Sequence, residues 1–279
     1  MKALIPAAGH GTRFLPASKT VPKEMLPVGA RPAIQLIVEE ALAAGADEVV
    51  IVTSPDKPSL RRHFEADAAW RERCASRPEA DAELAHLEEV GRRIRWAVQT
   101  EQRGLGHAVL QAADFLRGEK EPVLVLLGDA LVSGEAPSAA MAAISRATGG
   151  ASVVGLEEVP SEKVSRYGIV KGERVEMPGV GGDVLKLSDL VEKPRVEEAP
   201  SRLAIAGRYL LDPAVFDLLA TQRPGYGGEI QLTDAIRRLL AERPVYGYRY
   251  PGRRHDIGNP AGYLETLLAF AAPKCSPRA

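Results

Sequence analysis

The sequence has few of the features that mark secreted, membrane-spanning or nucleic-acid-binding proteins. Its 279 residues include only two cysteines, Cys74 and Cys275, far apart and without a CxxC or metal-binding spacing. No apolar run reaches the ~18–20 residues of a membrane span, and residues 1–6 lead into a glycine-rich loop rather than a signal peptide. Lysine and arginine (36) balance aspartate and glutamate (37), so no basic surface for nucleic acid or an anionic membrane is expected. We therefore expect a cytoplasmic protein without a disulfide framework, a nucleic-acid partner or a membrane partner.

The rest of the composition is typical of a folded α/β protein. Hydrophobic residues make up 45% of the chain, and its length fits one large domain or one domain with an appendage. Apolar runs at 2–6, 49–53 and 123–127 predict buried strands, and residues 34–42 have the spacing of a helix. This βαβ pattern favours a doubly wound arrangement in the first half of the chain.

The pattern changes along the chain without a clear linker. Residues 63–95 are charged and rich in alanine, which predicts an exposed helical insertion. After residue 150, short runs at 152–156 and 168–170 predict strands, and helices are expected at 213–221 and 229–242. We expect one domain over residues 1–279, made of two halves that meet near residue 150.

The loop that follows the first strand, AAGHGTR at residues 7–13, has the composition of a phosphate-binding turn. Gly9 and Gly11 would let backbone amides approach an anion closely. Neither the dinucleotide pattern GxGxxG nor the P-loop pattern GxxxxGK[ST] is present. A plain strand-to-helix turn is the alternative that this loop alone leaves open.

The loop continues into a longer motif over residues 9–27, with three prolines and two lysines after the glycines. It resembles the opening signature GxGTRxxPxxxxxPKxxxP of bacterial UTP–glucose-1-phosphate uridylyltransferases, also called UDP-glucose pyrophosphorylases, in the sugar-phosphate nucleotidyltransferase group. Further landmarks follow in the family's order over most of the chain: Gln99, GLGHA at 104–108, GD at 128–129, YGIV at 167–170, VEKP at 191–194, AIAGRY at 204–209, GGEIQLTDA at 227–235 and DIG at 256–258. The helical insertion and the GGEIQLTDA segment resemble the uridylyltransferase branch more than the thymidylyltransferase branch.

The resemblance implies a fold and a reaction. The implied fold is a Rossmann-like doubly wound mixed sheet of the glycosyltransferase-A type, flanked by helices, with small α+β additions. Residues 1–150 would be the nucleotide-binding half, and residues 151–279 the sugar-binding half with C-terminal helices. In the implied reaction, glucose 1-phosphate attacks the α-phosphorus of UTP, which forms UDP-glucose and releases pyrophosphate. Because the nucleophile is already an anion, positioning and cations suffice and no general base is needed.

Two cations occupy catalytic positions in the motif. Arg13 would contact the β- and γ-phosphates and assist the leaving group, and Lys23 would place a point charge near the α-phosphate. The alternative for either residue is a solvated surface cation.

Two carboxylates are implied as Mg²⁺ ligands, Asp129 at the end of a strand and Asp256 in the DIG motif. Many relatives carry a second acidic residue where this chain has Ala130, which leaves the metal affinity open. The alternatives are that Asp129 caps a following helix and that Asp256 pairs with Arg253 or Arg254. The histidines have no zinc-ligand spacing.

The resemblance also implies two sets of binding residues. A glutamine amide suits the uracil edge because it both donates and accepts hydrogen bonds, but thymine presents the same edge, so the choice between UTP and dTTP stays open. The implied nucleotide-binding residues are Ala7, Ala8, Gly9, Gly11, Thr12, Glu24, Gln99 and Gly104. The implied sugar-phosphate-binding residues are Tyr167, Gly168, Glu192, Lys193 and Gly207, although Glu192 and Lys193 could instead form a plain surface pair.

Two other functions compete with this interpretation. One is a glucose-1-phosphate thymidylyltransferase, and the other is a catalytically silent regulator that binds a sugar nucleotide. A silent relative should have lost charged site residues, but those of this chain are present apart from the acid missing at Ala130. The resemblance further implies a homodimer or homotetramer.

Overall fold

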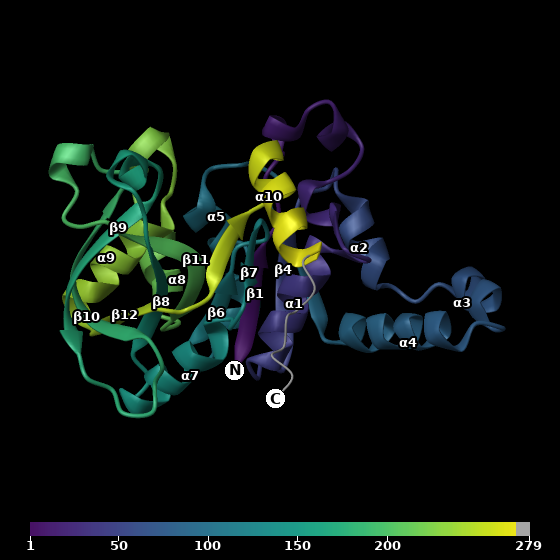
Figure 1. The fold of residues 1–279 in the computed structure, drawn as a ribbon. Helices are drawn as coiled ribbons and strands as arrows, with labels where there is room; N and C mark the ends of the chain where they lie inside the picture. The colour runs from purple at the N-terminus through teal and green to yellow at the C-terminus, as the bar shows by residue number, and fades with distance from the viewer. Residues whose placement is uncertain (272–279) are drawn as a thin grey trace.

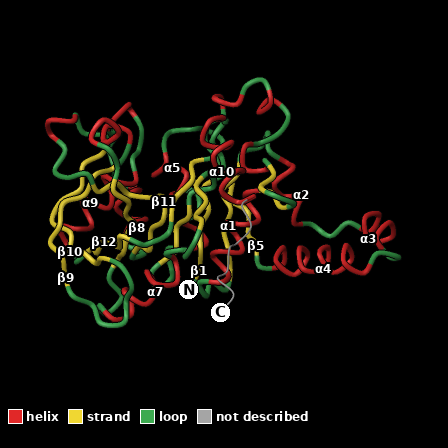
Figure 2. The backbone as a smooth tube through the Cα atoms, in the orientation of Figure 1, coloured by secondary structure: helices red, strands yellow, loops and turns green. Residues whose placement is uncertain are grey.

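One mixed sheet of nine strands organises residues 1–271, the part of the chain that this computed structural model describes (Figures 1 and 2). In spatial order its strands are β5 (Ile94–Val98), β4 (Glu48–Thr53), β1 (Lys2–Pro6), β6 (Val123–Leu126), β11 (Leu203–Leu211), β8 (Ser152–Glu158), β12 (Val245–Arg249), β10 (Asp183–Glu192) and β9 (Gly168–Val175). The first four strands run parallel, β11 runs antiparallel to β6, and the pairings beyond β11 include both directions. Two small antiparallel pairs lie apart from it, β2 (Pro27–Val28) with β3 (Arg31–Pro32) and β7 (Ala130–Ser133) with β13 (Arg253–Asp256).

Helices cover both faces of the sheet and create two hydrophobic cores. They are α1 (Ala33–Ala43), α2 (Pro58–Phe64), α3 (Ala68–Cys74), α4 (Pro78–Arg92), α5 (Leu105–Leu110), α6 (Ala113–Leu116), α7 (Ser138–Ala147), α8 (Val215–Ala220), α9 (Leu232–Glu242) and α10 (Pro260–Ala271). In β1, Ala3 and Ile5 belong to the core under α1, α2 and α7, whereas Leu4 belongs to the core under α5, α6, α8 and α9. Because alternate residues of a strand face opposite sides, a strand buried on both faces is apolar throughout.

The apolar runs predicted as strands at 2–6, 49–53 and 123–127 are confirmed as β1, β4 and β6, the last ending one residue earlier. Several other strands were not predicted. β10 contains charged residues, and β11 contains a glycine and an arginine, which interrupt the apolar pattern; β5 lies at the end of the charged segment. The helix expected at 229–242 begins only at Leu232, because a 3₁₀ turn with positive φ at Gly227 and Gly228 precedes it.

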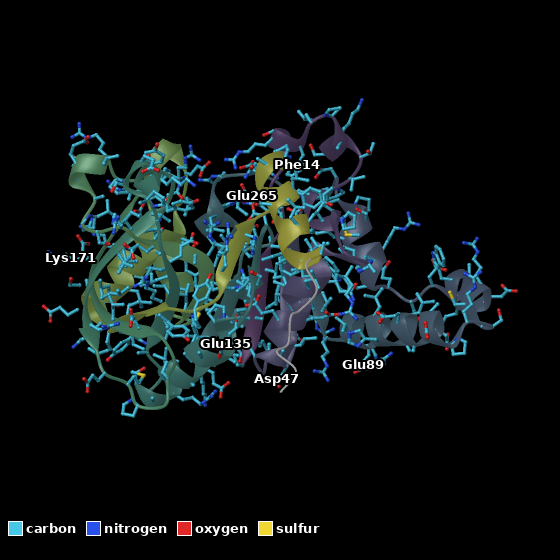
Figure 3. The ribbon with its side chains drawn as sticks, in the orientation of Figure 1. Phe14, Asp47, Glu89, Glu135, Lys171 and Glu265 are labelled. Carbon is cyan, nitrogen blue, oxygen red and sulfur yellow. The ribbon has the colours of Figure 1, made fainter. Side chains whose placement is uncertain are left out.

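The charged segment forms the predicted exposed helices, α3 and α4, which project from the body of the molecule (Figure 1). Charged side chains such as Lys171 on β9, at one end of the molecule, and Glu89 on α4 are exposed (Figure 3). Cys74 is buried in α3, whereas Cys275 lies outside the described residues, so their lack of pairing stays a prediction. Within residues 1–271, no helix is both long and apolar enough to cross a membrane.

The strand order creates a crevice at one edge of the sheet. From β1 the chain passes outward to β4 and β5, and then returns to β6 on the opposite side of β1. The loops after β1 and β6 therefore leave in different directions, and open α/β sheets bind ligands at such a switch point. The first of these loops is the glycine-rich segment, and the second, residues 127–129, contains Gly128 and Asp129.

A buried arginine joins this edge to the rest of the structure. Arg208 in β11 has no solvent exposure, and its guanidinium donates to both carboxylate oxygens of Glu40 in α1, at 2.9 and 2.7 Å. It also donates to the backbone oxygens of Gly207 and Ala130, and Ser138 donates to Glu40. Burial alone would raise the pKa of Glu40, but Arg208 and Ser138 bring that pKa below its ordinary value.

Replacing this arginine should therefore destabilise the fold strongly. Arg208→Met leaves Glu40 as a buried charge without its partner, and we expect a loss of about 3–5 kcal/mol in unfolding free energy, measured by denaturant titration at pH 7. The exposed pair Arg195–Glu198 supplies the control, since Arg195→Met removes a solvated ion pair and should change the unfolding free energy far less. Because the pKa of Glu40 is lowered by folding, the Arg208 contribution should be complete above pH ~4.5 and be lost as the pH falls below that value. Equal effects of the two substitutions would contradict this account.

Candidate functional site

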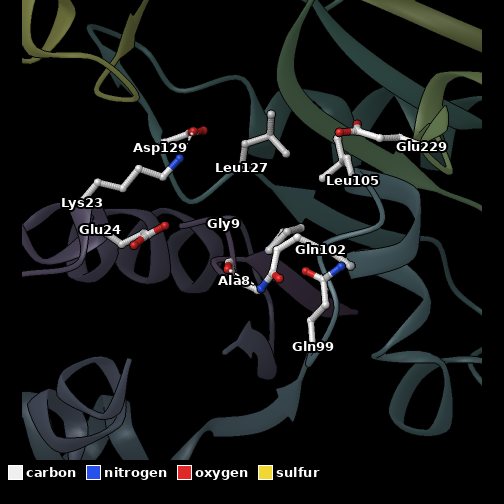
Figure 4. A pocket seen from close by; sticks show the side chains of 13 residues that line it. Ala8, Gly9, Lys23, Glu24, Gln99, Gln102, Leu105, Leu127, Asp129 and Glu229 are labelled. Atoms are coloured by element: carbon white, nitrogen blue, oxygen red, sulfur yellow. Dashed lines mark hydrogen bonds and ion pairs between the residues drawn. The ribbon is translucent and has the colours of Figure 1, made fainter. Parts of the chain in front are cut away.

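A cavity of about 320 Å³ lies at the switch point, between the loops that follow β1 and β6 (Figure 4). Lys23, Glu24 and Asp129 stand on one side of it, with Gln99 and Gln102 below and Glu229 opposite (Figure 4). The residues that line it are Pro6, Ala8, Gly9, Lys23, Glu24, Gln99, Gln102, Gly104, Leu105, Ala108, Leu127, Asp129 and Glu229. Seven of the residues proposed from the sequence are thus brought to one cavity.

The charged centre of the cavity is the ion pair between Lys23 and Asp129. The lysine Nζ lies 2.6 Å from the Oδ2 atom of Asp129, and both side chains are mostly shielded from solvent. Burial alone would lower the pKa of Lys23, but Asp129 and Glu24 raise it above its ordinary value. Burial would raise the pKa of Asp129, but Lys23 lowers it. The free protein therefore holds a protonated lysine against an ionised carboxylate.

The second proposed metal ligand, Asp256, lies close to Asp129. A Cβ atom on Gly258 would stand 2.8 Å from an oxygen of Asp256 and 3.2 Å from an oxygen of Asp129, so these two oxygens are no more than about 6 Å apart. Only a glycine leaves this space open between the carboxylates. No group of three or more histidine, cysteine or acidic side chains in residues 1–271 could hold a metal ion by itself. Two carboxylates fit Mg²⁺, which commonly takes its other ligands from phosphates and water.

The structure excludes two alternative roles for these acids. Asp129 caps no helix, because the strand β7 follows it directly. Asp256 accepts hydrogen bonds from the backbone of Gly258 and the amide of Asn259, whereas the nearby Arg254 pairs with Glu157. Ala130 is buried in β7.

A buried lysine that the sequence did not single out lies under the glycine-rich loop. The Nζ atom of Lys57 donates to the backbone oxygens of Ala7 and Gly9, at 2.8 and 2.5 Å. It also lies 3.0 and 3.1 Å from the two carboxylate oxygens of Glu24. Burial raises the pKa of Glu24, an effect that Lys57 only partly offsets, and burial lowers the pKa of Lys57. Both oxygens of Glu24 are therefore already engaged by a cation.

On the other side of the cavity, Gln99 forms a polar chain with two residues of the next helix. Gln99 is 3% exposed, and its Nε2 atom lies 2.9 Å from Nδ1 of His107. The other ring nitrogen of His107 lies 3.2 Å from Nε2 of Gln111. Gln102 donates to the backbone oxygen of Ala8 and so fixes the loop from this side as well. A neutral imidazole accepts a hydrogen bond at one ring nitrogen only, so these two amide nitrogens cannot both donate to His107. The contact with His107 restrains the amide of Gln99.

Gly104 brings two distant segments together at the wall of the cavity. Its φ angle of +104° is one that residues with a side chain rarely adopt, and a Cβ atom there would lie 2.7 Å from the Cβ of Glu229. The backbone nitrogen of Ile230 donates to Arg103, and that of Gly106 donates to Ile230. The GGEIQLTDA segment therefore packs on the segment around Gly104 only because this position has no side chain.

Five of the seven residues of the glycine-rich loop, Ala7 and residues 10–13, do not line the cavity. Gly11 adopts a left-handed conformation with φ +66°, and a short 3₁₀ helix (Thr12–Phe14) follows it. Thr12 and Arg13 are exposed. Gly9 does line the cavity, and a Cβ atom there would meet no protein atom within 4 Å. The glycine therefore leaves cavity space open rather than relieving a contact within the protein.

The proposed sugar residues form a second cluster. Glu192 accepts a hydrogen bond from Thr233 at 2.7 Å and pairs with Lys193 at 3.3 Å. Lys193 has a positive φ of 44°, a strained backbone for a lysine, and its amine stacks over the ring of Tyr226.

Glycines and a tyrosine complete this cluster. Gly168 faces Glu192, because a Cβ atom there would lie 3.2 Å from a carboxylate oxygen of Glu192. Tyr167 accepts a backbone hydrogen bond from Lys193, and its ring packs under Arg254. Gly207, with φ +74°, accepts a backbone hydrogen bond from Leu127, which lines the cavity. This last contact places Gly207 beside the cavity wall.

Comparison with known proteins identifies the family. The model of the nucleotidyl transferase family matches residues 2–272. The chain belongs to the nucleotidyl transferase family. It is 42% identical over 271 residues to the UTP–glucose-1-phosphate uridylyltransferase of Staphylococcus epidermidis, covering 97% of this chain and 92% of that protein. It is equally similar to the enzyme of the same name from Staphylococcus haemolyticus, over 278 residues with the same coverage.

Solved structures of family members show the same fold. A UDP-glucose pyrophosphorylase complexed with UDP-glucose has a TM-score of 0.83 at 38% identity, covering 96% of this chain and 97% of that one. The UTP-bound enzyme from Acinetobacter baumannii has a TM-score of 0.83 at 36% identity, covering 98% and 94%. A glucose-1-phosphate thymidylyltransferase from Bacillus anthracis, 22% identical, has a TM-score of 0.72 and shows the fold alone. The mixed α/β fold expected from the resemblance is that of the uridylyltransferases in this family.

Sequence reasoning missed some cavity residues of this family member. Gln102 and Glu229 line the cavity, and their positions inside the quoted motifs or beside them could have indicated this. Lys57 follows a predicted strand, so its position at the carboxyl edge of the sheet could have been predicted from the sequence. The burial of Lys57 could not be predicted, because its hydrogen-bond acceptors come from segments about 30 to 50 residues away in the sequence.

Proposed function

We propose that this protein forms UDP-glucose and pyrophosphate from UTP and glucose 1-phosphate. The observation that carries the proposal is the cavity at the switch point, where Lys23 and Asp129 meet opposite Gln99. The near full-length similarity to uridylyltransferases supports the same assignment. A cation, an acid and a base-reading amide around one cavity are the groups that transfer of a nucleotidyl group needs.

The reaction requires two anions to approach each other. Lys23 supplies a positive charge inside the cavity, where low exposure strengthens its effect on the α-phosphate. Arg13 stands exposed on the same loop, and its forked guanidinium suits the β- and γ-phosphates of the leaving group. The attacking phosphate oxygen is ionised at neutral pH, so the side chains bind, orient and neutralise rather than remove a proton.

We assign Asp129 and Asp256 as the residues that hold Mg²⁺. When bound, the ion neutralises developing charge on the phosphate oxygens. Because Lys23 already contacts Asp129 in the free protein, binding of the nucleotide gives this amine a second anion to contact. With only two carboxylates, the site depends on phosphate oxygens and water to complete the coordination.

The remaining residues recognise the substrates. The loop from Ala7 to Thr12 and the amide of Gln99 hold the nucleotide, with Gly104 giving it room. Glu24 is held under this loop by Lys57, so it acts through that lysine and not as a free carboxylate at the uracil edge. Glu192 accepts hydrogen bonds from glucose hydroxyls and Lys193 contacts the sugar phosphate. Tyr167, Gly168 and Gly207 shape that subsite.

The same proposal covers the organisation of the chain. Residues 1–150 provide the nucleotide half of a Rossmann-like doubly wound domain, and residues 151–279 provide the sugar half. The protein acts as a homodimer or homotetramer, without nucleic acid or a membrane as a partner.

Nucleotide preference tests the proposal. We expect purified protein with Mg²⁺ and glucose 1-phosphate to release pyrophosphate chiefly with UTP, in parallel assays with dTTP, ATP, CTP and GTP. Preference for dTTP would make the protein a thymidylyltransferase. Binding of UTP or UDP-glucose without release under any condition would instead indicate a silent binding protein, with Ala130 as the first position to restore.

The role of Lys23 can be measured by substitution. Lys23→Ala should lower kcat at least a hundredfold, since losing one charge-stabilising donor typically costs ~2.7–4 kcal/mol of barrier. Lys19→Ala supplies the control, because Lys19 is exposed on the same segment, and it should keep the activity within about twofold. Circular dichroism of both variants should match that of the unsubstituted protein. Normal turnover in a folded Lys23→Ala variant would remove Lys23 from the mechanism.

A further inference from the structure

Lys57 is the most completely engaged cation near the cavity. Its side chain is 5% exposed, and its three N–H groups are used by two backbone oxygens and the Glu24 carboxylate. No donor is left for a phosphate. A lysine that binds substrate keeps donors directed toward the cavity, so this lysine must act through the groups that it holds.

Lys57 joins three segments that are separate in the sequence. It precedes α2, in the turn after β4, and β4 pairs with β1 in parallel. From there its amine reaches the glycine-rich loop at Ala7 and Gly9. It also reaches Glu24 in the short 3₁₀ helix (Lys23–Met25), which carries the cavity lysine. One ammonium group therefore sets the position of the loop relative to Lys23.

The hydrogen bonds also determine which way the loop amides point. In a planar trans peptide, the N–H of one residue points opposite to the C=O of the residue before it. Because Lys57 holds the oxygens of Ala7 and Gly9, the N–H groups of Ala8 and His10 point to the opposite side of the loop. Within residues 1–271, the backbone N–H groups of residues 8–11 donate no hydrogen bond to the protein. Such unpaired amides in a glycine-rich loop are suited to bind an anion.

We infer that Lys57 is a positioning residue for the nucleotide, which presents the loop amides by holding the Ala7 and Gly9 oxygens and places Lys23 by holding Glu24. The inference rests on the proposed function, and it gives Lys57 a role in that function without contact to either substrate. Its effect falls on the nucleotide, because the loop and Glu24 lie in the nucleotide half. Among the described residues, Glu192 and Lys193 of the sugar cluster form no hydrogen bond or ion pair with Lys57.

The test compares Lys57→Met with a matched lysine. Met has a similar length and no charge, so Lys57→Met should raise the UTP dissociation constant at least tenfold in calorimetry. It should also raise KM for UTP, while KM for glucose 1-phosphate changes less than threefold. Lys2→Met is the control, because Lys2 lies at the other end of β1 and pairs with Glu48 and Glu119. Unchanged UTP affinity in Lys57→Met, or an equal rise of both KM values, would overturn the inference.

A double variant separates positioning from folding. Lys57→Met leaves the buried Glu24 carboxylate unpaired, and Glu24→Gln in the same chain removes that charge and should recover most of the lost Tm. The Ala7 and Gly9 oxygens still lack their donor, so the UTP dissociation constant should remain at least fivefold raised. Recovery of both Tm and UTP affinity would show that Lys57 only neutralises Glu24. Calorimetry measures UTP binding and does not require turnover. If the unsubstituted protein binds UTP but releases no pyrophosphate, the proposed reaction is rejected, and the inference about Lys57 can still be tested.

Discussion

The structure depends on a buried guanidinium at the point where the parallel and antiparallel parts of the sheet meet. Arg208 lies in β11, the first antiparallel neighbour of the parallel strands, and Glu40 reaches it from α1 on the face of the sheet. The same side chain holds the backbone of Ala130 directly after Asp129, and the backbone of Gly207. The residue after a proposed metal ligand is thus fixed by the ion pair that stabilises the fold.

The cavity shows the same principle at a smaller scale, because each buried cation there is paired with an acid. Lys23 holds Asp129, and Lys57 holds Glu24. Burying single charges would be costly, whereas paired charges with further hydrogen bonds are tolerated. The two pairs differ in whether the lysine keeps an N–H donor for a substrate. Lys57 has no donor to spare, but Lys23 borders the cavity and contacts one acid, so it can contact an incoming phosphate as well.

The sequence predicted those parts of the fold where one physical pattern dominates. Strands β1, β4 and β6 are buried on both faces, so they read as unbroken apolar runs. Strands β10 and β11 were missed because Lys186, Asp189 and Arg208 interrupt their pattern, and the charge of Arg208 is paired with Glu40, which is distant in the sequence.

The candidate site follows the same division. Motif positions brought Lys23, Gln99 and Asp129 to one cavity, but a lone lysine in a turn, such as Lys57, is ordinarily a solvated surface charge. Its burial results from the packing of β4 beside β1, which places the turn after one strand next to the loop after the other. The engagement of Glu24 by Lys57 follows from the same arrangement and could not be predicted from local sequence.

The central claim is that the two carboxylates bind a divalent ion only together with the nucleotide, since Asp129 is held by Lys23 and residues 1–271 provide no group of three or more acidic, histidine or cysteine ligands. The most direct test is equilibrium dialysis of the protein against Mn²⁺, with and without UTP, beside the Asp256→Asn variant. The account predicts little retained Mn²⁺ without UTP, about one equivalent with UTP, and a loss of that equivalent in the variant. One equivalent retained without any nucleotide would contradict it.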